Sequence, residues 1–201
     1  MKKALTLILA LMMLLCSVSA LAELAGGWTV PEDTTLTDEA LDVFYGAVGY
    51  DANLWPQCVM GTQVVAGTNY AMLCAGLNDV EIVYVYHNVS GENELLRRQV
   101  LVAYDDTAVG GWMKLGDDQP GEEGFEAIRS AFDSLLGISV DEYYILAQQV
   151  VAGTNYMVLC RKVTVTAEPV NGWAMATVYV APDGSASVTD MQDVVLSISE
   201  D

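Results

Sequence analysis

Residues that could perform covalent or metal chemistry are few in this sequence. His87 is the only histidine among the 201 residues, so a serine or cysteine nucleophile has a single candidate base. Cys58, Cys74 and Cys160 are scattered along the chain and, with this histidine, lack the spacing of metal ligands. The sequence therefore predicts neither an enzyme nor a metal or cofactor site.

A different chemistry, recognition through an apolar loop, is indicated by a repeated octapeptide. Gln-Val-Val-Ala-Gly-Thr-Asn-Tyr occupies residues 63–70 and, 86 positions later (149 minus 63), residues 149–156. A period of this length exceeds the roughly 20–50 residues of solenoid repeats and matches a small domain with its own core. We therefore expect a tandem duplication in which each copy folds separately and carries its own site.

The octapeptide combines a turn glycine with apolar neighbours. Gly67 and Gly153 supply the permissive backbone of a tight turn. Turns are usually rich in Asn, Asp, Ser and Pro, whereas Val-Val-Ala precedes the glycine in both copies. Two interpretations follow: the apolar tip is a surface that a partner buries, or Val64 and Val65 still belong to a strand and only Ala-Gly turns.

Each copy reads as one helix followed by strands. Apolar stripes with helical spacing lie at residues 40–48 and 125–136. Thr37 is a predicted N-cap, and Gly49 and Gly137 are predicted to end the two helices.

After the helix, β-branched and aromatic residues alternate with breaks at Gly, Asn and Asp. The predicted strands are residues 57–66, 70–76, 80–86 and 95–104 in the first copy, and residues 144–152, 156–166, 173–180 and 185–197 in the second. The expected fold class is α+β, with one helix packed across an antiparallel sheet of about four to five strands in each copy.

The chain begins like an exported protein. A basic start, an apolar run and an Ala-x-Ala site predict a Sec-type signal peptide over residues 1–22, cleaved after Ala22, and hence a secreted protein. Lipid attachment at Cys16 is the alternative. The two copies are then expected to form domains over residues 23–106 and residues 107–201.

The sequence is strongly acidic, with 8 basic and 27 acidic residues and a net charge of −19. Removing Lys2 and Lys3 with the signal peptide leaves 6 basic residues and a net charge of −21. Nucleic acid and anionic membranes are therefore not expected as partners. The acidity is typical of a soluble extracellular protein.

The cysteines after residue 22 number three, so at most one disulfide can form within a monomer. Cys58 and Cys74 are placed symmetrically about Ala66 and would face each other across a hairpin. Cross-strand Cβ atoms lie ~4.5–5.5 Å apart, within reach of a disulfide. The matching residues of the second copy are Tyr144 and Cys160. Buried thiols acting as small apolar side chains are the alternative.

The repeated motif resembles that of a known family. Residues 63–67 and 149–153 resemble the first hairpin loop of the cystatins, which inhibit papain-like cysteine proteases, and the Thr-Asn-Tyr that follows is similar to the stefin form. The resemblance covers both copies and implies two tandem cystatin-like domains of a secreted bacterial type. It also implies a wedge of three elements that fills the protease cleft: a glycine-containing N-terminal segment, the first hairpin loop, and a second loop that carries a Trp.

Transferred to this sequence, the resemblance implies the following protease-binding residues: Gly26, Gln63, Val64, Val65, Ala66, Gly67, Gly110, Gln149, Val150, Val151, Ala152, Gly153 and Trp173. In the first copy the N-terminal segment is free and offers Leu24 and Ala25, but the expected second loop, residues 76–79, has no Trp. In the second copy the segment at residues 109–111 is tethered, while the loop at residues 168–173 supplies the Trp. The second copy is therefore expected to inhibit better.

Two functions remain in view. The first is reversible inhibition of papain-like proteases by occlusion of their active-site cleft. The second is a non-inhibitory binding or structural module at the cell exterior, because a fold does not fix a function. The chain is expected to be a monomer or a domain-swapped dimer that uses the first hairpin loop as its hinge.

Overall fold

The computed structural model describes residues 26–105, 107, 110–116 and 120–199. The predicted signal peptide, as well as Leu24, Ala25 and Val109, lies outside the described residues. The helices are α2 (Asp38–Val48) and α3 (Gly121–Asp133), with a 3₁₀ turn η1 (Tyr50–Ala52), and the strands are β1 (Trp55–Val65), β2 (Gly67–Ala75), β3 (Asp79–Asn88), β4 (Asn93–Ala103), β5 (Ile138–Val151), β6 (Gly153–Thr164), β7 (Asn171–Val180) and β8 (Ala186–Val194).

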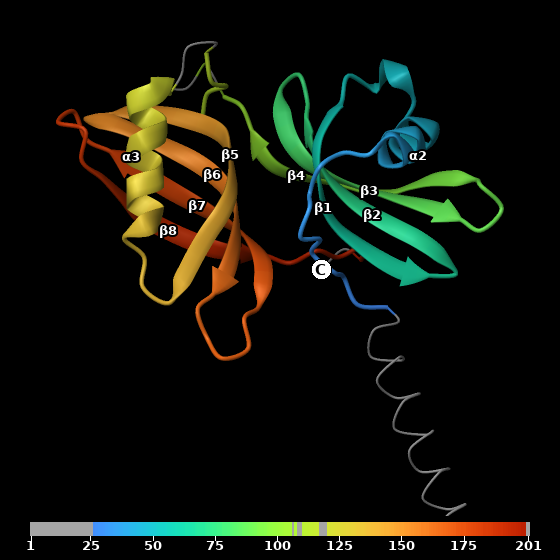
Figure 1. Cartoon of the computed structure of the whole chain (residues 1–201). Coiled ribbons are helices and arrows are strands. Elements are labelled where there is room, and N and C mark those ends of the chain that lie inside the picture. Colours follow the sequence, from blue (N-terminus) through green and yellow to red (C-terminus); the bar gives the residue numbers. More distant parts are fainter. Residues whose placement is uncertain (1–25, 106, 108–109, 117–119, 200–201) are drawn as a thin grey trace, which may run out of the picture.

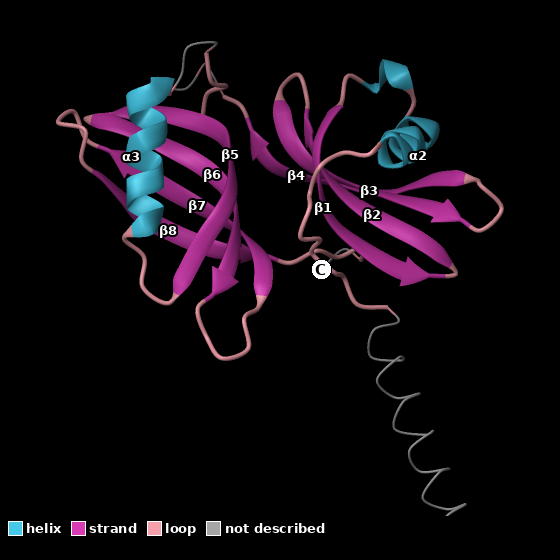
Figure 2. Ribbon diagram, viewed as in Figure 1, coloured by secondary structure: helices cyan, strands magenta, loops and turns pink. Residues whose placement is uncertain are grey.

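The strands form two antiparallel sheets of four strands each, in the orders β1-β2-β3-β4 and β5-β6-β7-β8 (Figure 2). Every connection joins neighbouring strands, so each sheet is a simple meander. The two helices lie on opposite sides of the molecule (Figure 1). Within the described part of the chain, no helix is long and apolar enough to cross a membrane.

Local sequence explains where the first helix begins and ends. The Thr37 side chain accepts a hydrogen bond from the Ala40 amide at 3.1 Å, as an N-cap should, and Asp38 and Glu39 place negative charge in the first turn. Gly49, with a φ of 85°, ends the helix. The predicted N-cap is confirmed.

Both faces of each sheet are apolar. In β2, Met72 and Cys74 point into a cluster formed with α2, whereas Ala71 and Leu73 point into a separate cluster on the other face. All four side chains are at most 1% exposed. A sheet whose strands are apolar on both faces needs a cover on each side.

The predicted fold class is therefore wrong. An α+β arrangement of two self-contained units, each with one helix across its own sheet, does not describe this molecule. The described residues form eight strands and only two α-helices, and the two sheets pack against each other over a common core. The prediction assigned one sheet face to the helix and named no cover for the other, although the strands carry apolar residues on both faces.

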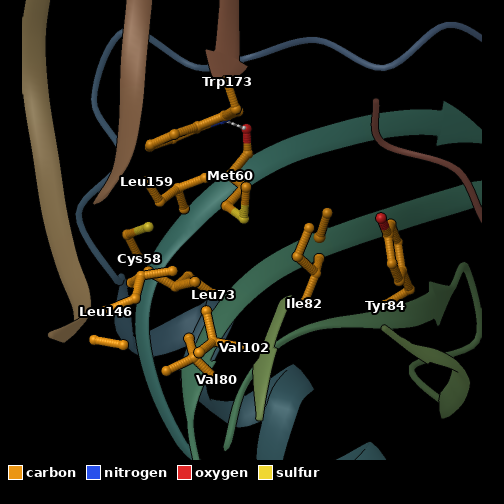
Figure 3. Packing of buried hydrophobic residues seen from close by; sticks show 12 residues of the cluster. Cys58, Met60, Leu73, Val80, Ile82, Tyr84, Val102, Leu146, Leu159 and Trp173 are labelled. Carbon is orange, nitrogen blue, oxygen red and sulfur yellow. Dashed lines mark hydrogen bonds between the residues drawn. The ribbon is translucent and has the colours of Figure 1, made fainter. Parts of the chain in front are cut away.

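The common core joins the two copies into one folded body (Figure 3). Its buried members come from both sheets: Cys58, Met60, Ala71, Leu73, Val80, Ile82, Tyr84 and Val102 from the first, and Leu146, Ala147, Leu159 and Trp173 from the second. The expectation of separately folding copies does not fit this shared core. The domain boundary between residues 106 and 107 stays a prediction.

Segments outside the sheets also cross between the copies. Arg161 of β6 donates to the carbonyl oxygens of Pro31 and Glu32 at 2.8 and 2.6 Å. In the other direction, Arg97 of β4 donates to the carbonyl oxygens of Ser197 and Ser199, both at 2.7 Å. Each copy thus holds the terminal segment of the other.

A pair of β-bulges lies in the contact between the sheets. The pairing of β1 with β2 skips Met60, and that of β5 with β6 skips Leu146, 86 positions later. The backbone carbonyl of each bulge accepts a hydrogen bond from the other copy. Trp173 Nε1 donates to Met60 O at 2.7 Å (Figure 3), and Tyr104 Oη donates to Leu146 O at 3.1 Å.

The predicted Cys58–Cys74 disulfide is absent, because the two side chains lie on opposite faces of the sheet. Cys58 belongs to the common core and Cys74 to the cluster under α2. A register shift after Pro56 places Cys58 opposite Leu73 instead. Cys58, Cys74 and Cys160 are all free and buried, which matches the buried-thiol alternative.

Replacing Trp173 with Phe should lower the free energy of unfolding by about 1–3 kcal/mol, because the Met60 carbonyl would remain buried without a donor. Urea denaturation followed by circular dichroism measures this, and the shared core predicts one transition for both copies. Trp55→Phe is the matched control, since Trp55 is 46% exposed and its change should stay within about 0.5 kcal/mol. An unchanged midpoint for Trp173→Phe would contradict the role of this hydrogen bond.

The thiols should be unreactive in the native protein. Burial raises the pKa of both Cys58 and Cys160 to about 12, and it also raises the pKa of Cys74. At pH 8 a thiol of pKa about 12 is ionised to only about one part in 10⁴, and the thiolate is the reactive form. A thiol-specific chromophoric reagent should count three thiols in residues 23–201 after unfolding without reductant, and react slowly before it. A count of one would instead reveal a disulfide.

Candidate functional site

The octapeptide forms a tight hairpin turn in each copy. Val65 pairs with Gly67 across the turn, so Ala66 alone occupies the bend. Val64 and Val65 therefore belong to strand β1, and they are also 63% and 44% exposed. The valines thus end a strand, as the second interpretation held, and they still face solvent, whereas burial by a partner stays a prediction.

The second copy repeats this geometry. Val151 pairs with Gly153, and Ala152 occupies the bend between β5 and β6. Val150 and Val151 are 59% and 46% exposed. Two exposed pairs of valines at equivalent positions are a feature that the core does not require.

Only glycine fits after the bend. Gly67 and Gly153 have φ angles of 139° and 127°, which side-chain-bearing residues rarely adopt. A Cβ atom on Gly67 would lie 2.3 Å from the His87 carbonyl oxygen, and one on Gly153 would lie 2.6 Å from that of Val180. The neighbouring strand therefore approaches too closely for any other residue.

The glutamine of the first octapeptide ties the hairpin to the N-terminal segment. Gln63 Nε2 donates to the Gly26 carbonyl at 2.5 Å, and Asn69 Nδ2 donates to Gln63 Oε1 at 2.6 Å. A backbone bridge between Thr29 and Thr62 continues the contact. The amide of Asn69, which is buried, thus orients the glutamine that holds the glycine segment in place.

The same chain of two side-chain hydrogen bonds, which we call the relay, exists in the second copy with slightly different lengths. Gln149 Nε2 donates to the Gly110 carbonyl at 2.7 Å, and Asn155 Nδ2 donates to Gln149 Oε1 at 2.7 Å. Met113 and Gln148 form the equivalent backbone bridge. The relay accounts for two of the eight identical residues of the octapeptide.

A tyrosine from the next strand holds the bend itself. Tyr86 of β3 donates its hydroxyl to the Ala66 carbonyl at 2.5 Å, and Tyr179 of β7 does the same for Ala152 at 2.5 Å. The carbonyl at the outermost point of each turn is therefore fixed by the sheet behind it.

A second turn lies at the same end of each sheet. Because strands of a meander alternate in direction, the β3–β4 turn at residues 88–92 adjoins the first octapeptide turn, and the β7–β8 turn at residues 181–185 adjoins the second. Val89 is 86% exposed at the outside of the first, and Pro182 is exposed at the equivalent place of the second.

This arrangement corrects the predicted second loops. Residues 76–79 and 168–173 surround the β2–β3 and β6–β7 turns, which lie at the opposite ends of the sheets from the octapeptides. The β3–β4 and β7–β8 turns, which do adjoin the octapeptide turns, share only a glycine at equivalent positions. These are Gly91 and Gly184, with φ angles of 87° and 83°. One common glycine is too little for sequence comparison of the two copies to reveal.

Trp173 lies away from the sheet ends that carry the octapeptide turns. It is 1% exposed, its indole nitrogen is bonded to the Met60 carbonyl, and its ring lies 6.4 Å from that of Tyr144. The residue expected to anchor a partner is instead a central residue of the common core. We therefore remove it from the candidate site.

We call the remaining assemblies the first tip and the second tip. The first tip consists of Gly26, residues 63–67 and residues 88–92. The second tip consists of Gly110, residues 149–153 and residues 181–185. In both, the glycine of the segment that precedes the helix, which we call the trunk glycine, is exposed. Its φ is positive, 113° for Gly26 and 79° for Gly110. Each tip therefore brings three separate chain segments to one end of a sheet.

The tips contain no reactive arrangement. His87 Nδ1 lies 2.7 Å from the Asn93 side-chain oxygen, a structural contact behind the first tip. Among the residues that the structure describes, no group of three or more His, Cys, Asp or Glu side chains could hold a metal ion. The chemistry that this arrangement supports is burial of apolar surface by a partner.

A search of protein-family models, of curated proteins and of solved structures finds no match to this chain.

Gly153→Ala should destabilise the protein by about 1–3 kcal/mol, because the positive φ and the Val180 carbonyl both oppose a Cβ atom. Gly172→Ala is the matched control in the same sheet, where the nearest atom to the added carbon is Lys162 Cε at 4.0 Å. The control should be neutral or slightly stabilising, since alanine restricts the unfolded chain. Equal midpoints for the two variants in urea would show that the bend tolerates a side chain.

Proposed function

We propose that this chain is a secreted, reversible inhibitor of papain-like cysteine proteases, and that the tips are the surfaces that enter the active-site cleft. One observation carries the proposal: each copy presents a trunk glycine and two turns at the same end of its sheet, with exposed apolar residues on the turns. The resemblance of the octapeptide to the cystatin loop names the class of partner.

Exposing the valine side chains to water costs free energy, and a partner that buries them would recover it. Burying a fully exposed valine side chain is worth about 1.5–3 kcal/mol, and because Val64 and Val65 are 63% and 44% exposed, covering the pair offers about that amount of association energy. Val64 and Val65 are held in a strand and the bend behind them is fixed by hydrogen bonds, so little conformational entropy remains to be lost on binding. An apolar and preorganised tip is what occlusion of a cleft requires.

The geometry of the bend also explains why such a tip would block a protease without being cut. A substrate must lie extended across the catalytic residue, whereas Ala66 and Ala152 occupy a tight bend. Their carbonyl oxygens are engaged by Tyr86 and Tyr179, so opening the bend would cost both hydrogen bonds and strand pairing. The proposed action is exclusion of substrate.

Burial of Trp173 changes the expected ranking of the two copies. Neither described tip contains an aromatic anchor, which usually dominates an interface. The valine pairs of the two tips are exposed to a similar extent, and the first tip adds the 86% exposed Val89 where the second tip has the exposed Pro182. We therefore expect the first tip to bind at least as well as the second.

The lack of an aromatic anchor is also what favours the alternative function, a non-inhibitory binding module. In that case the tips would still bury their valines against a partner, but the partner would not be a cysteine protease. The net charge of −19 favours a partner with a basic surface in either case.

The test is residual papain activity in the presence of residues 23–201. We expect inhibition at or below micromolar concentration, and a loss of at least about 100-fold for the Val64→Glu, Val150→Glu double variant, because a carboxylate would have to be desolvated in the cleft. Leu77→Glu with Val165→Glu is the matched control. It adds the same two charges at exposed positions at the other end of each sheet and should inhibit like the parent.

Melting curves establish that all variants are folded. No inhibition at a micromolar excess of the parent protein, or an equal loss in the control, would overturn the proposal and leave the non-inhibitory module.

A further inference from the structure

We infer that one chain holds two protease molecules at the same time, one on each tip, in a complex of one inhibitor and two proteases. The inference rests on the proposed function and adds to it the number and placement of the partners.

The first observation is where the tips lie. The turns of the first tip, between β1 and β2 and between β3 and β4, project from one end of the molecule, and those of the second tip project from the other (Figure 1). The strands leading to them are 9–14 residues long and span roughly 30–45 Å at about 3.3 Å per residue. The two tips therefore point away from each other.

The second observation is that each tip is complete without the other. The relay of the first tip uses Gln63, Asn69 and Gly26, and its bend is held by Tyr86, all from the first copy. The second tip uses the equivalent residues of the second copy, Gln149, Asn155, Gly110 and Tyr179. No residue named in either set crosses to the other copy, so occupying one tip does not remove a support of the other.

The third observation is that the contact between the copies leaves the tips free. The common core and its central hydrogen bond from Trp173 to Met60 involve neither pair of exposed valines. The copies are thus joined through their sheet faces and not through the surfaces that bind.

Surface area leaves room for two partners. A specific interface buries about 800 Å² on each partner. Two such interfaces would occupy about an eighth of the 12297 Å² accessible surface of the chain. The opposite placement of the tips lets two partners approach from different sides.

The consequence is that the sites act independently on free proteases and cooperatively on immobilised ones. A single soluble protease engages one tip and gains nothing from the other. Two proteases fixed close together on a surface would be bridged, because the second contact then forms at a high effective concentration.

The experiment is a titration of residues 23–201 with papain, read by light scattering of the chromatographically separated complex and, in the same samples, by residual activity. We expect saturation at two papain molecules per chain. Val64→Glu and Val150→Glu, tested singly, should each saturate at one papain molecule per chain, with the remaining tip retaining its affinity. The Leu77→Glu, Val165→Glu control should saturate at two.

Saturation of the parent at one papain molecule, with activity inhibited, would overturn the two-partner inference and leave the proposed function intact. The two-partner inference also fails if one single variant abolishes all binding while the other changes nothing, because only one tip would then be active. Absence of both complex and inhibition would overturn the proposed function itself, so the two failures are distinguishable.

Discussion

The structure depends on sheets that cannot be left with an uncovered face. A four-stranded meander with apolar side chains on both sides exposes one face after a single helix has packed on the other. In this chain the second cover is the equivalent face of the other copy, and the bulges at Met60 and Leu146 lie in that contact. Their freed carbonyl groups accept hydrogen bonds across the interface, so apolar burial and polar satisfaction are achieved together.

Much of the local structure could be predicted from the sequence, because it depends on neighbours in the chain. The N-cap at Thr37, the helix end at Gly49 and the turns at Gly67 and Gly153 all follow from backbone preferences of single residues. The face-to-face packing of the sheets could not be inferred from those preferences. The alternating apolar residues of β2 were visible, but which partner covers each face is a tertiary choice that periodicity does not encode.

The candidate site, too, could be predicted from the sequence only in part. The octapeptide identified the valines, the glycine and the glutamine of each tip. The second turns stayed hidden because the copies share only a glycine there, and Trp173 was misplaced because an aromatic side chain close to a loop in sequence belongs to the core in space. Tyr86 and Tyr179 also escaped notice, since their function depends on lying behind a bend formed by a different hairpin.

The shared core has a consequence for how the chain reaches its folded state. Ribosomes release the first copy before β5 exists, so the sheet of β1 to β4 is complete while one of its apolar faces has no cover. Exposed apolar surface on a partly made chain favours aggregation and recruits chaperones. The segment that Arg97 holds follows β8 and is therefore made after all eight strands. Final assembly of the first copy must therefore wait until the strands of the second copy and the segment after β8 have been made.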